Sequence, residues 1–214
     1  MINKDLAKVT RNENFFYSFI KRVLDIVGSL VGLVVLSPIM LIVAILIKFD
    51  SKGPILFSQT RVGKNGNEFK MYKFRSMVVD AEELKEKLQE KNERKGPMFK
   101  MKDDPRITKI GKFIRKTSID ELPQLINILK GEMSIVGPRP SLPKEVAQFD
   151  DWMLERLEVK PGLTCYWQVE GRDDIEFREW MELDVKYVRE RNLKIDIVLI
   201  FKTVFVLFGD KNAS

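Results

Sequence analysis

The chain has 214 residues, with 37 lysines and arginines, 31 aspartates and glutamates, and 44% hydrophobic residues. This composition indicates an ordered chain with one domain of ordinary size, and the net charge of +6 favours anionic partners. The absence of histidine excludes a histidine base, a Ser-His-Asp triad and histidine-ligated metal sites. The single cysteine, Cys165, excludes an intrachain disulfide and a structural zinc site and favours a reducing compartment. Any metal is therefore expected to be a hard cation such as Mg²⁺, held by carboxylates and phosphates.

The first predicted element is an almost continuous apolar segment, residues 23–47, with basic residues on both sides. As one straight helix it would be roughly 37 Å long, enough to cross a hydrocarbon core of about 30 Å. Pro38, preceded by Ser37, predicts a break that leaves two legs too short to cross. Because positive charge flanks both ends, we expect a re-entrant helix with both ends on the cytosolic side. A single span with a proline kink is the alternative.

The rest of the chain predicts a small hairpin and several helices. Alternating apolar and polar residues predict strands over 54–61 and 68–75, joined by a turn at 63–66. Helical patterns cover 80–95, 119–129, 144–157 and 175–191. The apolar segment 195–208 is too short to span a bilayer, and it suits either an interfacial helix or a buried core helix.

Two adjacent carboxylates, Asp120 and Glu121, stand at the predicted start of a helix. Ser118 and Glu121 have the spacing of a capping box, in which Glu121 would bind a backbone N–H. Pro123 argues against that interpretation, because it would occupy an interior helical position without an N–H. If Asp120 is the cap instead, both carboxylates lie at the helix N-terminus, where phosphate also binds. On this evidence a structural and a functional role for the pair are equally open.

Arginines stand on both sides of the acidic pair. Arg115 lies five residues before Asp120, and Arg139 lies between two prolines in Gly137-Pro138-Arg139-Pro140. The prolines restrict the backbone at Arg139, and guanidinium groups bind phosphate in a bidentate manner. Carboxylate nucleophiles and arginines are the groups that move a phosphoryl group. The pattern therefore indicates an enzyme that acts on phosphates, and the apolar segment places it at a membrane.

The chain resembles the bacterial sugar transferases, the monotopic polyprenyl-phosphate glycosyl-1-phosphate transferases (phosphoglycosyl transferases), over residues 16–208. A series of motifs in the same order carries the resemblance. They are Lys21-Arg22-Val-Leu-Asp25, Ser37-Pro38, Phe57–Gly63, Tyr72–Met77, Asp104–Thr108, Thr117–Gln124, Met133–Pro140, Lys160–Thr164 and Trp167–Arg172. Many members have glycine where this chain has Cys165, so it departs from the family pattern on the nucleotide or sugar side of the site.

The resemblance implies a reaction in two steps. Asp120 attacks the β-phosphate of a UDP-sugar, releases UMP and holds the sugar phosphate as an acyl phosphate. Undecaprenyl phosphate then attacks and leaves as undecaprenyl diphosphate-sugar, which starts the synthesis of a bacterial surface glycan. Mg²⁺ is expected near Asp120 and Glu121, and Glu121 either orients the nucleophile or binds the ion.

The resemblance also implies which residues bind substrate and lipid. The expected substrate ligands are Arg115, Arg139, Lys73, Arg75, Arg106, Gln124, Pro140, Thr164, Gln168 and Arg172. Lys21 and Arg22 are expected to meet lipid head groups, with Ser37-Pro38 at the turn of the re-entrant helix.

These expectations give a helix-rich α+β chain with two parts. Residues 1–50 form the tail and membrane helix, and residues 51–214 form a cytosolic catalytic domain with interfacial helices. The chain is expected in the bacterial cytoplasmic membrane with its site facing the cytoplasm. Its further partners are phospholipids and downstream glycosyltransferases, and it is close in length to the catalytic unit alone.

Two other classes of function compete with this interpretation. A membrane-tethered nucleic-acid binder would also be basic, and Phe69, Tyr72 and Phe74 alternate with lysines as in a base-stacking strand. A catalytically silent scaffold of the same fold is the second alternative. The intact Asp120-Glu121 pair argues against silence, and we expect no nucleic-acid partner.

Overall fold

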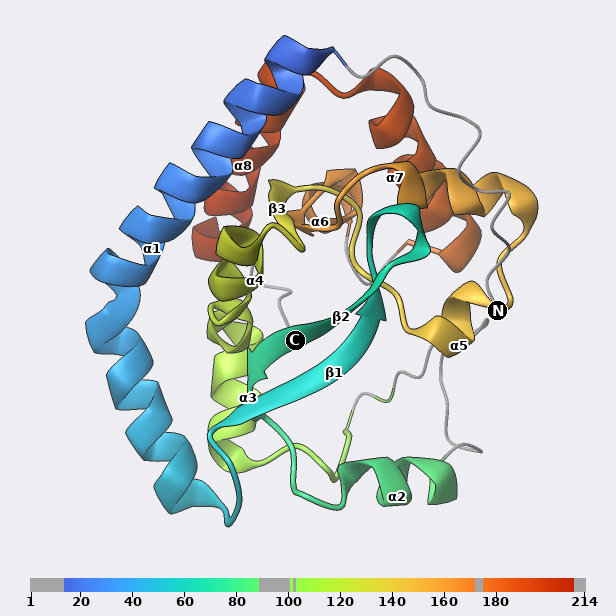
Figure 1. The fold of residues 1–214 in the computed structure, drawn as a ribbon. Coiled ribbons are helices and arrows are strands. Elements are labelled where there is room, and N and C mark those ends of the chain that lie inside the picture. Colours follow the sequence, from blue (N-terminus) through green and yellow to red (C-terminus); the bar gives the residue numbers. More distant parts are fainter. Residues whose placement is uncertain (1–13, 89–100, 102, 172–174, 210–214) are drawn as a thin grey trace.

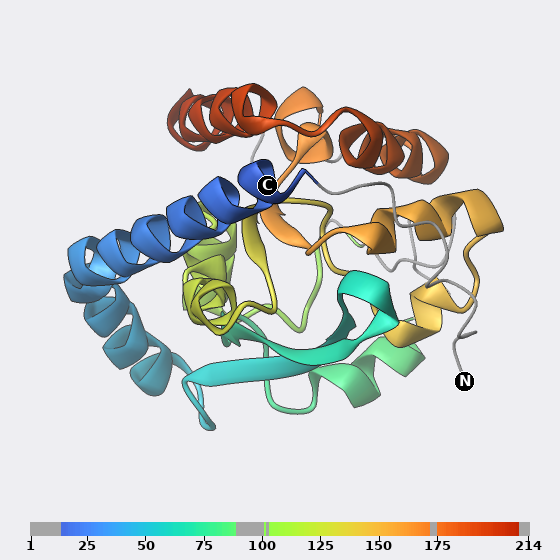
Figure 2. The same cartoon turned by 45° about the horizontal axis from the view of Figure 1, so that its top comes forward.

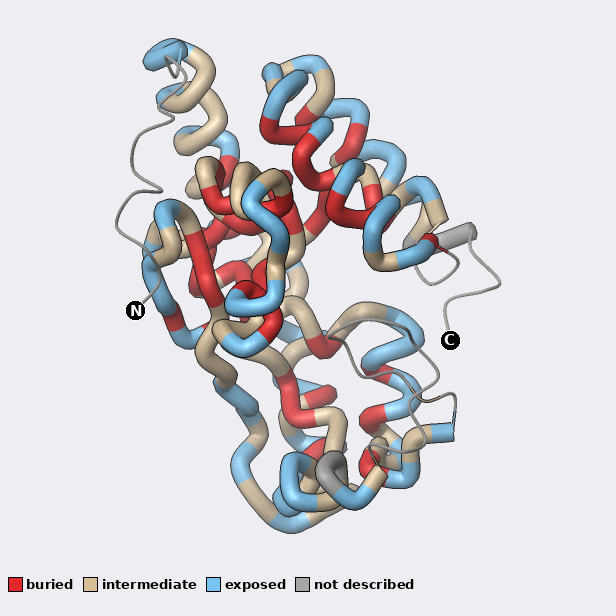
Figure 3. Tube along the Cα trace, turned by 90° about the vertical axis from the view of Figure 1, so that its right-hand side faces the viewer, coloured by how far each residue is buried: buried red, intermediate tan, exposed pale blue. Residues whose placement is uncertain are grey.

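The structure is a computed structural model that describes residues 14–88, 101, 103–171 and 175–209. In this part of the chain, helices pack around two small two-stranded sheets, of which the β1–β2 hairpin lies at one edge (Figure 1). The predicted helix-rich α+β architecture is therefore confirmed. Buried segments gather where the elements meet and recur along single faces of the helices (Figure 3).

Helix α1 (Phe15–Asp50) is continuous over 36 residues and runs through Pro38. Asn14 begins it by accepting the backbone N–H groups of Phe16 and Tyr17. Pro38 has no N–H for the carbonyl of Val34, and the Ser37 hydroxyl donates to that carbonyl instead, at 2.8 Å. Figures 1 and 2 show the helix changing direction partway along its length. The predicted break is thus a bend inside a continuous helix, because serine satisfies the acceptor that proline leaves free.

Both halves of α1 pack against the same body. In the first half, the buried Asp25 carboxylate accepts the Ser134 hydroxyl and the Ile135 N–H at 2.9 and 2.8 Å. In the second half, Val43 and Ile47 are buried in a core cluster. The opposite face of α1 exposes a row of large apolar side chains to the surroundings. By length and composition α1 could cross a membrane, and only 11% of its most apolar window is buried.

The predicted hairpin is confirmed. Strand β1 (Leu56–Val62) pairs antiparallel with β2 (Glu68–Phe74), and the turn η2 (Lys64–Gly66) joins them. On β2, Phe69 and Phe74 are buried in two different core clusters. The alternative of a base-stacking strand loses its support, because these two rings are buried in the core and only Tyr72 is partly accessible.

The remaining elements follow the hairpin in the chain. They are α2 (Ala81–Lys87), α3 (Lys109–Lys116), η4 (Ile119–Glu121), α4 (Gln124–Lys130), β3 (Ser134–Val136), α5 (Pro143–Val146), η5 (Asp151–Glu158), β4 (Gly162–Thr164), α6 (Tyr166–Glu170), α7 (Phe177–Glu190) and α8 (Leu193–Gly209). The predicted helix over 175–191 is confirmed, and the one over 80–95 is confirmed as far as the described residues go. The single helix predicted over 144–157 is wrong, because a turn separates α5 from η5.

Helix α8 lies beside the first half of α1 (Figures 1 and 2). A buried carboxylate joins them: Asp196 accepts Lys21 Nζ at 2.8 Å, the Tyr17 hydroxyl at 3.0 Å and the Tyr187 hydroxyl at 2.7 Å. The outer side of α8 exposes Phe201 and Phe205 among other apolar residues. The helix therefore contributes to the core through one face and leaves a second apolar face uncovered.

Candidate active site

The acidic pair lies on a tight turn between two helices. After α3, Ser118 adopts a left-handed backbone conformation with φ 56°, and the single turn η4 then carries Asp120 and Glu121. Such a conformation is uncommon for serine and is found at functional sites more often than elsewhere. Ser118 makes no side-chain capping bond, so the capping-box interpretation is wrong. Helix α4 instead begins after Pro123, which takes the cap position.

Glu121 is held by two cations that come from distant parts of the chain. Its Oε1 accepts Lys73 Nζ from β2 at 2.7 Å and Arg139 Nη1 at 3.0 Å. Burial raises the pKa of Glu121, but the charges and hydrogen bonds of Arg139 and Lys73 outweigh it and leave the pKa well below its usual range. Glu121 is therefore a fixed, ionised anchor for both cations.

Asp120 has a different environment from its neighbour. It is buried, with 7% of its surface exposed, and its nearest cation is Lys73 Nζ at 3.6 Å from Oδ2. Burial raises the pKa of Asp120, and the Lys73 charge opposes that rise. Asp120 therefore carries a carboxylate that the protein stabilises less than that of Glu121.

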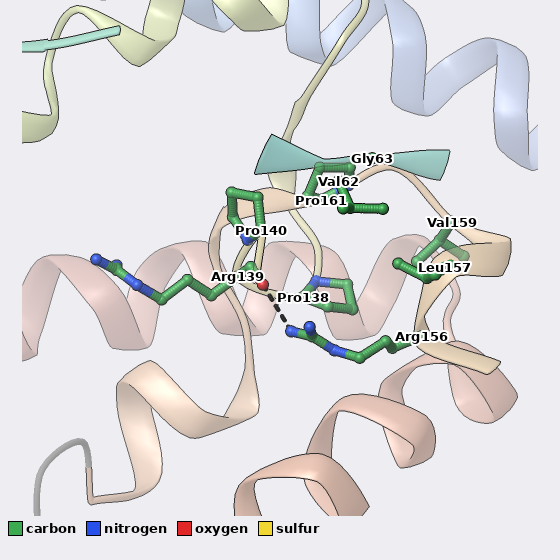
Figure 4. Close-up of a pocket in the computed structure, with 9 residues that line it drawn as sticks. All are labelled: Val62, Gly63, Pro138, Arg139, Pro140, Arg156, Leu157, Val159 and Pro161. Carbon is green, nitrogen blue, oxygen red and sulfur yellow. Dashed lines mark hydrogen bonds between the residues drawn. The ribbon is translucent and has the colours of Figure 1, made fainter. Parts of the chain in front are cut away.

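Arg139 enters the site from the loop after β3. Its guanidinium lies 5.9 Å from the centre of the Trp167 ring, and about a third of its side chain, 32%, is exposed. The charge of Glu121 raises the pKa of Arg139 further. Figure 4 shows the side chain extending away from the prolines and from the small cavity of about 10 Å³ behind the loop. The arrangement thus offers two cations and a buried carboxylate to a phosphate that enters from this side.

The comparisons with known proteins agree with this geometry. The family described as "Bacterial sugar transferase" matches residues 16–210, nearly the whole chain. This chain belongs to the bacterial sugar transferases. The family match and the site thus lead to the same class of protein.

Relatives of this bacterial sugar transferase differ in length. It is 50% identical to "Galactosyl transferase CpsE" of Streptococcus agalactiae, over 87% of this chain and 42% of that protein. It is 45% identical to "Undecaprenyl-phosphate galactose phosphotransferase" of Salmonella typhimurium, over 88% of this chain and 40% of that protein. It is 40% identical to "Exopolysaccharide production protein ExoY" of Sinorhizobium fredii, over 86% of this chain and 83% of that protein. The chain therefore spans about two fifths of the first two relatives and most of the third.

The other predicted substrate ligands are spread around the acidic pair. Arg115 is exposed on α3; burial raises the pKa of Asp120, and the Arg115 charge opposes that rise together with the larger effect of Lys73. Gln124 is buried at the start of α4, and Pro140 follows Arg139 in the loop. Arg172 lies outside the described residues. Of these residues, Arg115 is the one whose charge acts on the nucleophile candidate.

Thr164 and Gln168 are buried, on β4 and α6 of this bacterial sugar transferase. The Thr164 hydroxyl is 2.6 Å from that of Thr203 on α8, and Gln168 Nε2 donates to the Leu163 carbonyl at 3.4 Å. Cys165, between them, is fully buried in the core cluster that includes Tyr187. The departure from the family pattern at this position is therefore a core contact.

Two of the predicted ligands have structural roles. Arg75 is buried, and its guanidinium donates to the carbonyls of Ile47, Ser51 and Lys52 at the end of α1. Arg106 is also buried and forms a bidentate pair with Asp104, with contacts of 2.6 and 2.8 Å. In the structure Arg75 therefore caps the end of α1, and Arg106 holds its own loop.

The residues expected at lipid head groups also face inward. Lys21 donates to Asp196 and Tyr187, and Arg22 donates to the carbonyls of Ile128 and Leu129 at 2.6 and 2.8 Å. Both side chains border a cavity of about 250 Å³ next to the start of α1. In the structure they tie α1 to α4, α7 and α8, which the sequence did not indicate.

Arg61 is a site residue that the sequence analysis did not single out, although it stands in one of the quoted motifs. Its Nη1 donates to the Pro140 carbonyl at 3.1 Å, and its Nη2 to Gln59 at 2.8 Å. Burial, together with the nearby Arg139 charge, lowers the pKa of Arg61 to about 10. Its position on β1 therefore supports the Arg139 loop from the side of the hairpin.

Proposed function

We propose that this chain transfers a sugar-1-phosphate from a UDP-sugar to undecaprenyl phosphate through a covalent intermediate on Asp120. The observation that carries the proposal is the unequal environment of two adjacent carboxylates. Glu121 is fixed in its ionised form by Lys73 and Arg139, whereas Asp120 is buried and less well stabilised. Neighbouring carboxylates whose pKa values are pushed apart take different catalytic roles. The proposed lipid phosphate acceptor and sugar donor follow the name of the Salmonella relative, an undecaprenyl-phosphate galactose phosphotransferase.

In the first step, an oxygen of Asp120 forms a bond to the β-phosphorus of the UDP-sugar. The bond from that phosphorus to the bridging oxygen breaks, and UMP leaves with the oxygen and its electron pair. Lys73 and Arg139 lie on the side of the acidic pair where charge builds up on the phosphoryl oxygens. Glu121 holds both cations in place during the transfer.

In the second step, an oxygen of undecaprenyl phosphate attacks the same phosphorus. The acyl phosphate bond breaks, and Asp120 leaves as a carboxylate. Because the acceptor is already an anion, no general base is required, which agrees with a chain that has no histidine. The lipid diphosphate-sugar must then be extended by glycosyltransferases, so the reaction starts a surface glycan.

The residues of the site fit Mg²⁺. Among the described residues, no three His, Cys, Asp or Glu side chains are grouped to hold a metal. Mg²⁺ often binds through one or two carboxylates together with substrate phosphates, and Asp120 and Glu121 offer such oxygens. Glu121 Oε1 already accepts hydrogen bonds from Lys73 and Arg139, so the Asp120 carboxylate is the more available ligand for the ion. When bound, the ion would neutralise charge on the donor's diphosphate.

We further propose that α1 enters and leaves the same face of the cytoplasmic membrane, with the active site in the cytoplasm. Both halves of α1 pack against one body through their inner face, while the outer face exposes apolar side chains. A helix that crossed the bilayer would carry one of these halves away from that body. The bend at Pro38 and the apolar outer face of α8 fit insertion into one leaflet.

Labelling of introduced cysteines tests this topology. We expect Asn14→Cys and Lys52→Cys, both exposed at the two ends of α1, to react with an impermeant maleimide in inverted vesicles and not in intact spheroplasts. Cys165 is buried and serves as the internal background. Reaction of either introduced cysteine from outside intact spheroplasts would contradict the re-entrant arrangement and support a span.

The proposed reaction is tested by UMP release from the detergent-solubilised chain with Mg²⁺, undecaprenyl phosphate and a panel of UDP-sugars. We expect one donor to give sustained UMP release that stops when the lipid acceptor is omitted. The panel should include galactose, glucose and their N-acetylated forms. Absence of release from every donor, in a folded sample, would favour the silent scaffold.

A further inference from the structure

The loop that carries Arg139 is fixed through its backbone carbonyls. Four successive carbonyls, those of residues 138–141, each accept a hydrogen bond from a residue outside the loop, and the donors come from β1, η5 and β4. The donors are Gly162 N to Pro138 at 3.0 Å, Arg156 Nη2 to Arg139 at 2.6 Å, Arg61 Nη1 to Pro140 at 3.1 Å, and Val62 N to Ser141 at 2.9 Å. Because residues 138 and 140 are prolines without an N–H, the loop has fewer donors for internal hydrogen bonds. Its conformation therefore depends on these outside donors.

Arg156 is the most deeply buried of the side-chain donors. Its Nε and Nη2 donate to Asp184 Oδ2 on α7 at 3.1 and 2.7 Å, and the two side chains are 2% and 0% exposed. The same guanidinium donates to the Ser141 hydroxyl and to the Arg139 carbonyl (dashed in Figure 4). It also lies 5.6 Å from the centre of the Phe149 ring. The planar guanidinium of Arg156 on η5 thus binds Asp184 on α7 and both Arg139 and Ser141 of the loop. The single ammonium group of a lysine cannot reach all three.

We propose that Arg156, held by Asp184, is a positioning residue that sets the Arg139 guanidinium against Glu121 and the reacting phosphate. The proposal rests on the proposed function. Arg156 contacts the loop, Asp184 and Phe149, so it acts on the acidic pair through Arg139. The contact that it controls is the 3.0 Å bond from Arg139 Nη1 to Glu121.

The energetics of buried ion pairs separate positioning from a merely structural role. Removing one partner leaves an unpaired buried charge and destabilises the fold, whereas replacing both with apolar residues of similar size is often neutral or stabilising. The double variant Arg156→Met/Asp184→Leu can therefore keep the fold while removing the two hydrogen bonds from Arg156 to the loop. A structural role predicts full activity for such a folded variant, and a positioning role predicts a loss.

The chain offers a matched control pair on the same two elements. Glu155 on η5 and Arg189 on α7 form an exposed ion pair at 2.6 Å, one residue before Arg156 and on the helix that carries Asp184. Arg189→Met/Glu155→Leu removes the same charges and does not involve the loop. We expect this control to keep wild-type UMP release and melting temperature.

The test measures kcat, KM and melting temperature with the donor that the wild type uses. For Arg156→Met/Asp184→Leu we expect kcat/KM to fall about 10- to 100-fold at an unchanged melting temperature, since small misplacements of a substrate-positioning group have effects of this size. In an Arg139→Ala background the double change should cause no further loss, because its effect passes through Arg139. Full activity in the folded double variant, or losses that multiply in the Arg139→Ala background, would overturn the proposal.

A second variant covers the case in which the apolar pair does not fold. Arg156→Lys keeps a charge beside Asp184 and lacks the fork that reaches the loop, so it should fold and lose about 10-fold in kcat/KM. Wild-type activity in folded Arg156→Lys would also overturn the proposal. If the wild type itself releases no UMP with any donor, the proposed function fails. If the wild type is active and the folded variant is equally active, only the positioning role of Arg156 fails.

Discussion

Asp120→Asn is expected to abolish UMP release in both the presence and the absence of lipid acceptor. The change replaces the nucleophilic carboxylate with a neutral amide of almost the same shape, so the loss should reach at least about 10³-fold in kcat. Without acceptor, the wild type should release UMP in a burst of about one equivalent per enzyme, because the first step forms the aspartyl intermediate and stops. The variant should show no burst, and intact-protein mass spectrometry should find no added sugar phosphate.

The control for this prediction is Asp151→Asn, the same chemical change at an exposed position on η5. It should keep the burst and the steady-state rate. A burst of normal size in Asp120→Asn would rule out Asp120 as the nucleophile, even if turnover were slow. Turnover that proceeds in the wild type without any covalent adduct would instead indicate direct transfer between donor and acceptor.

The periodicity of apolar residues in the sequence correctly predicted the hairpin and helix α7. The alternation around residues 63–66 located the hairpin, and the helical spacing of residues 177–188 located α7. The interruption between α5 and η5 was not predictable, because Phe149 there packs on Phe177 and Arg156 turns towards Asp184. These are contacts between residues 28 positions apart, which no local pattern records.

The candidate site was predictable in its centre and not in its surroundings. Asp120, Glu121 and Arg139 were identified from the sequence motifs, and the structure brings them together with Lys73. Arg75 and Arg139 both stand in quoted motifs, yet only the structure shows that one guanidinium caps α1 and the other enters the site. The sequence motifs therefore identified both arginines, and only the structure shows that their hydrogen-bond partners differ.

Lys73→Met is the second change with a large expected effect, and it acts through the pKa of Asp120. Burial raises that pKa and the Lys73 charge lowers it, so removing the charge lets the pKa rise further. The nucleophile must be ionised, and a higher pKa leaves a smaller ionised fraction at any pH near or below it. The acid limb of the activity profile should therefore move to higher pH. The loss should be about 10²-fold at neutral pH, because a donor to the reacting phosphate is also removed.

The measurement is kcat/KM for UMP release between pH 5 and pH 9, with Lys70→Met as the control on the same strand. Lys70 is exposed and donates to Thr60 at 2.8 Å, so its removal should leave the profile unchanged. In Lys73→Met the ratio to wild type should be smallest at acid pH and should recover in part as pH rises. The part that does not recover measures the direct contact of Lys73 with the transferred phosphate. A uniform loss at every pH would mean that Lys73 binds substrate without tuning Asp120, and an unchanged rate would remove Lys73 from the site.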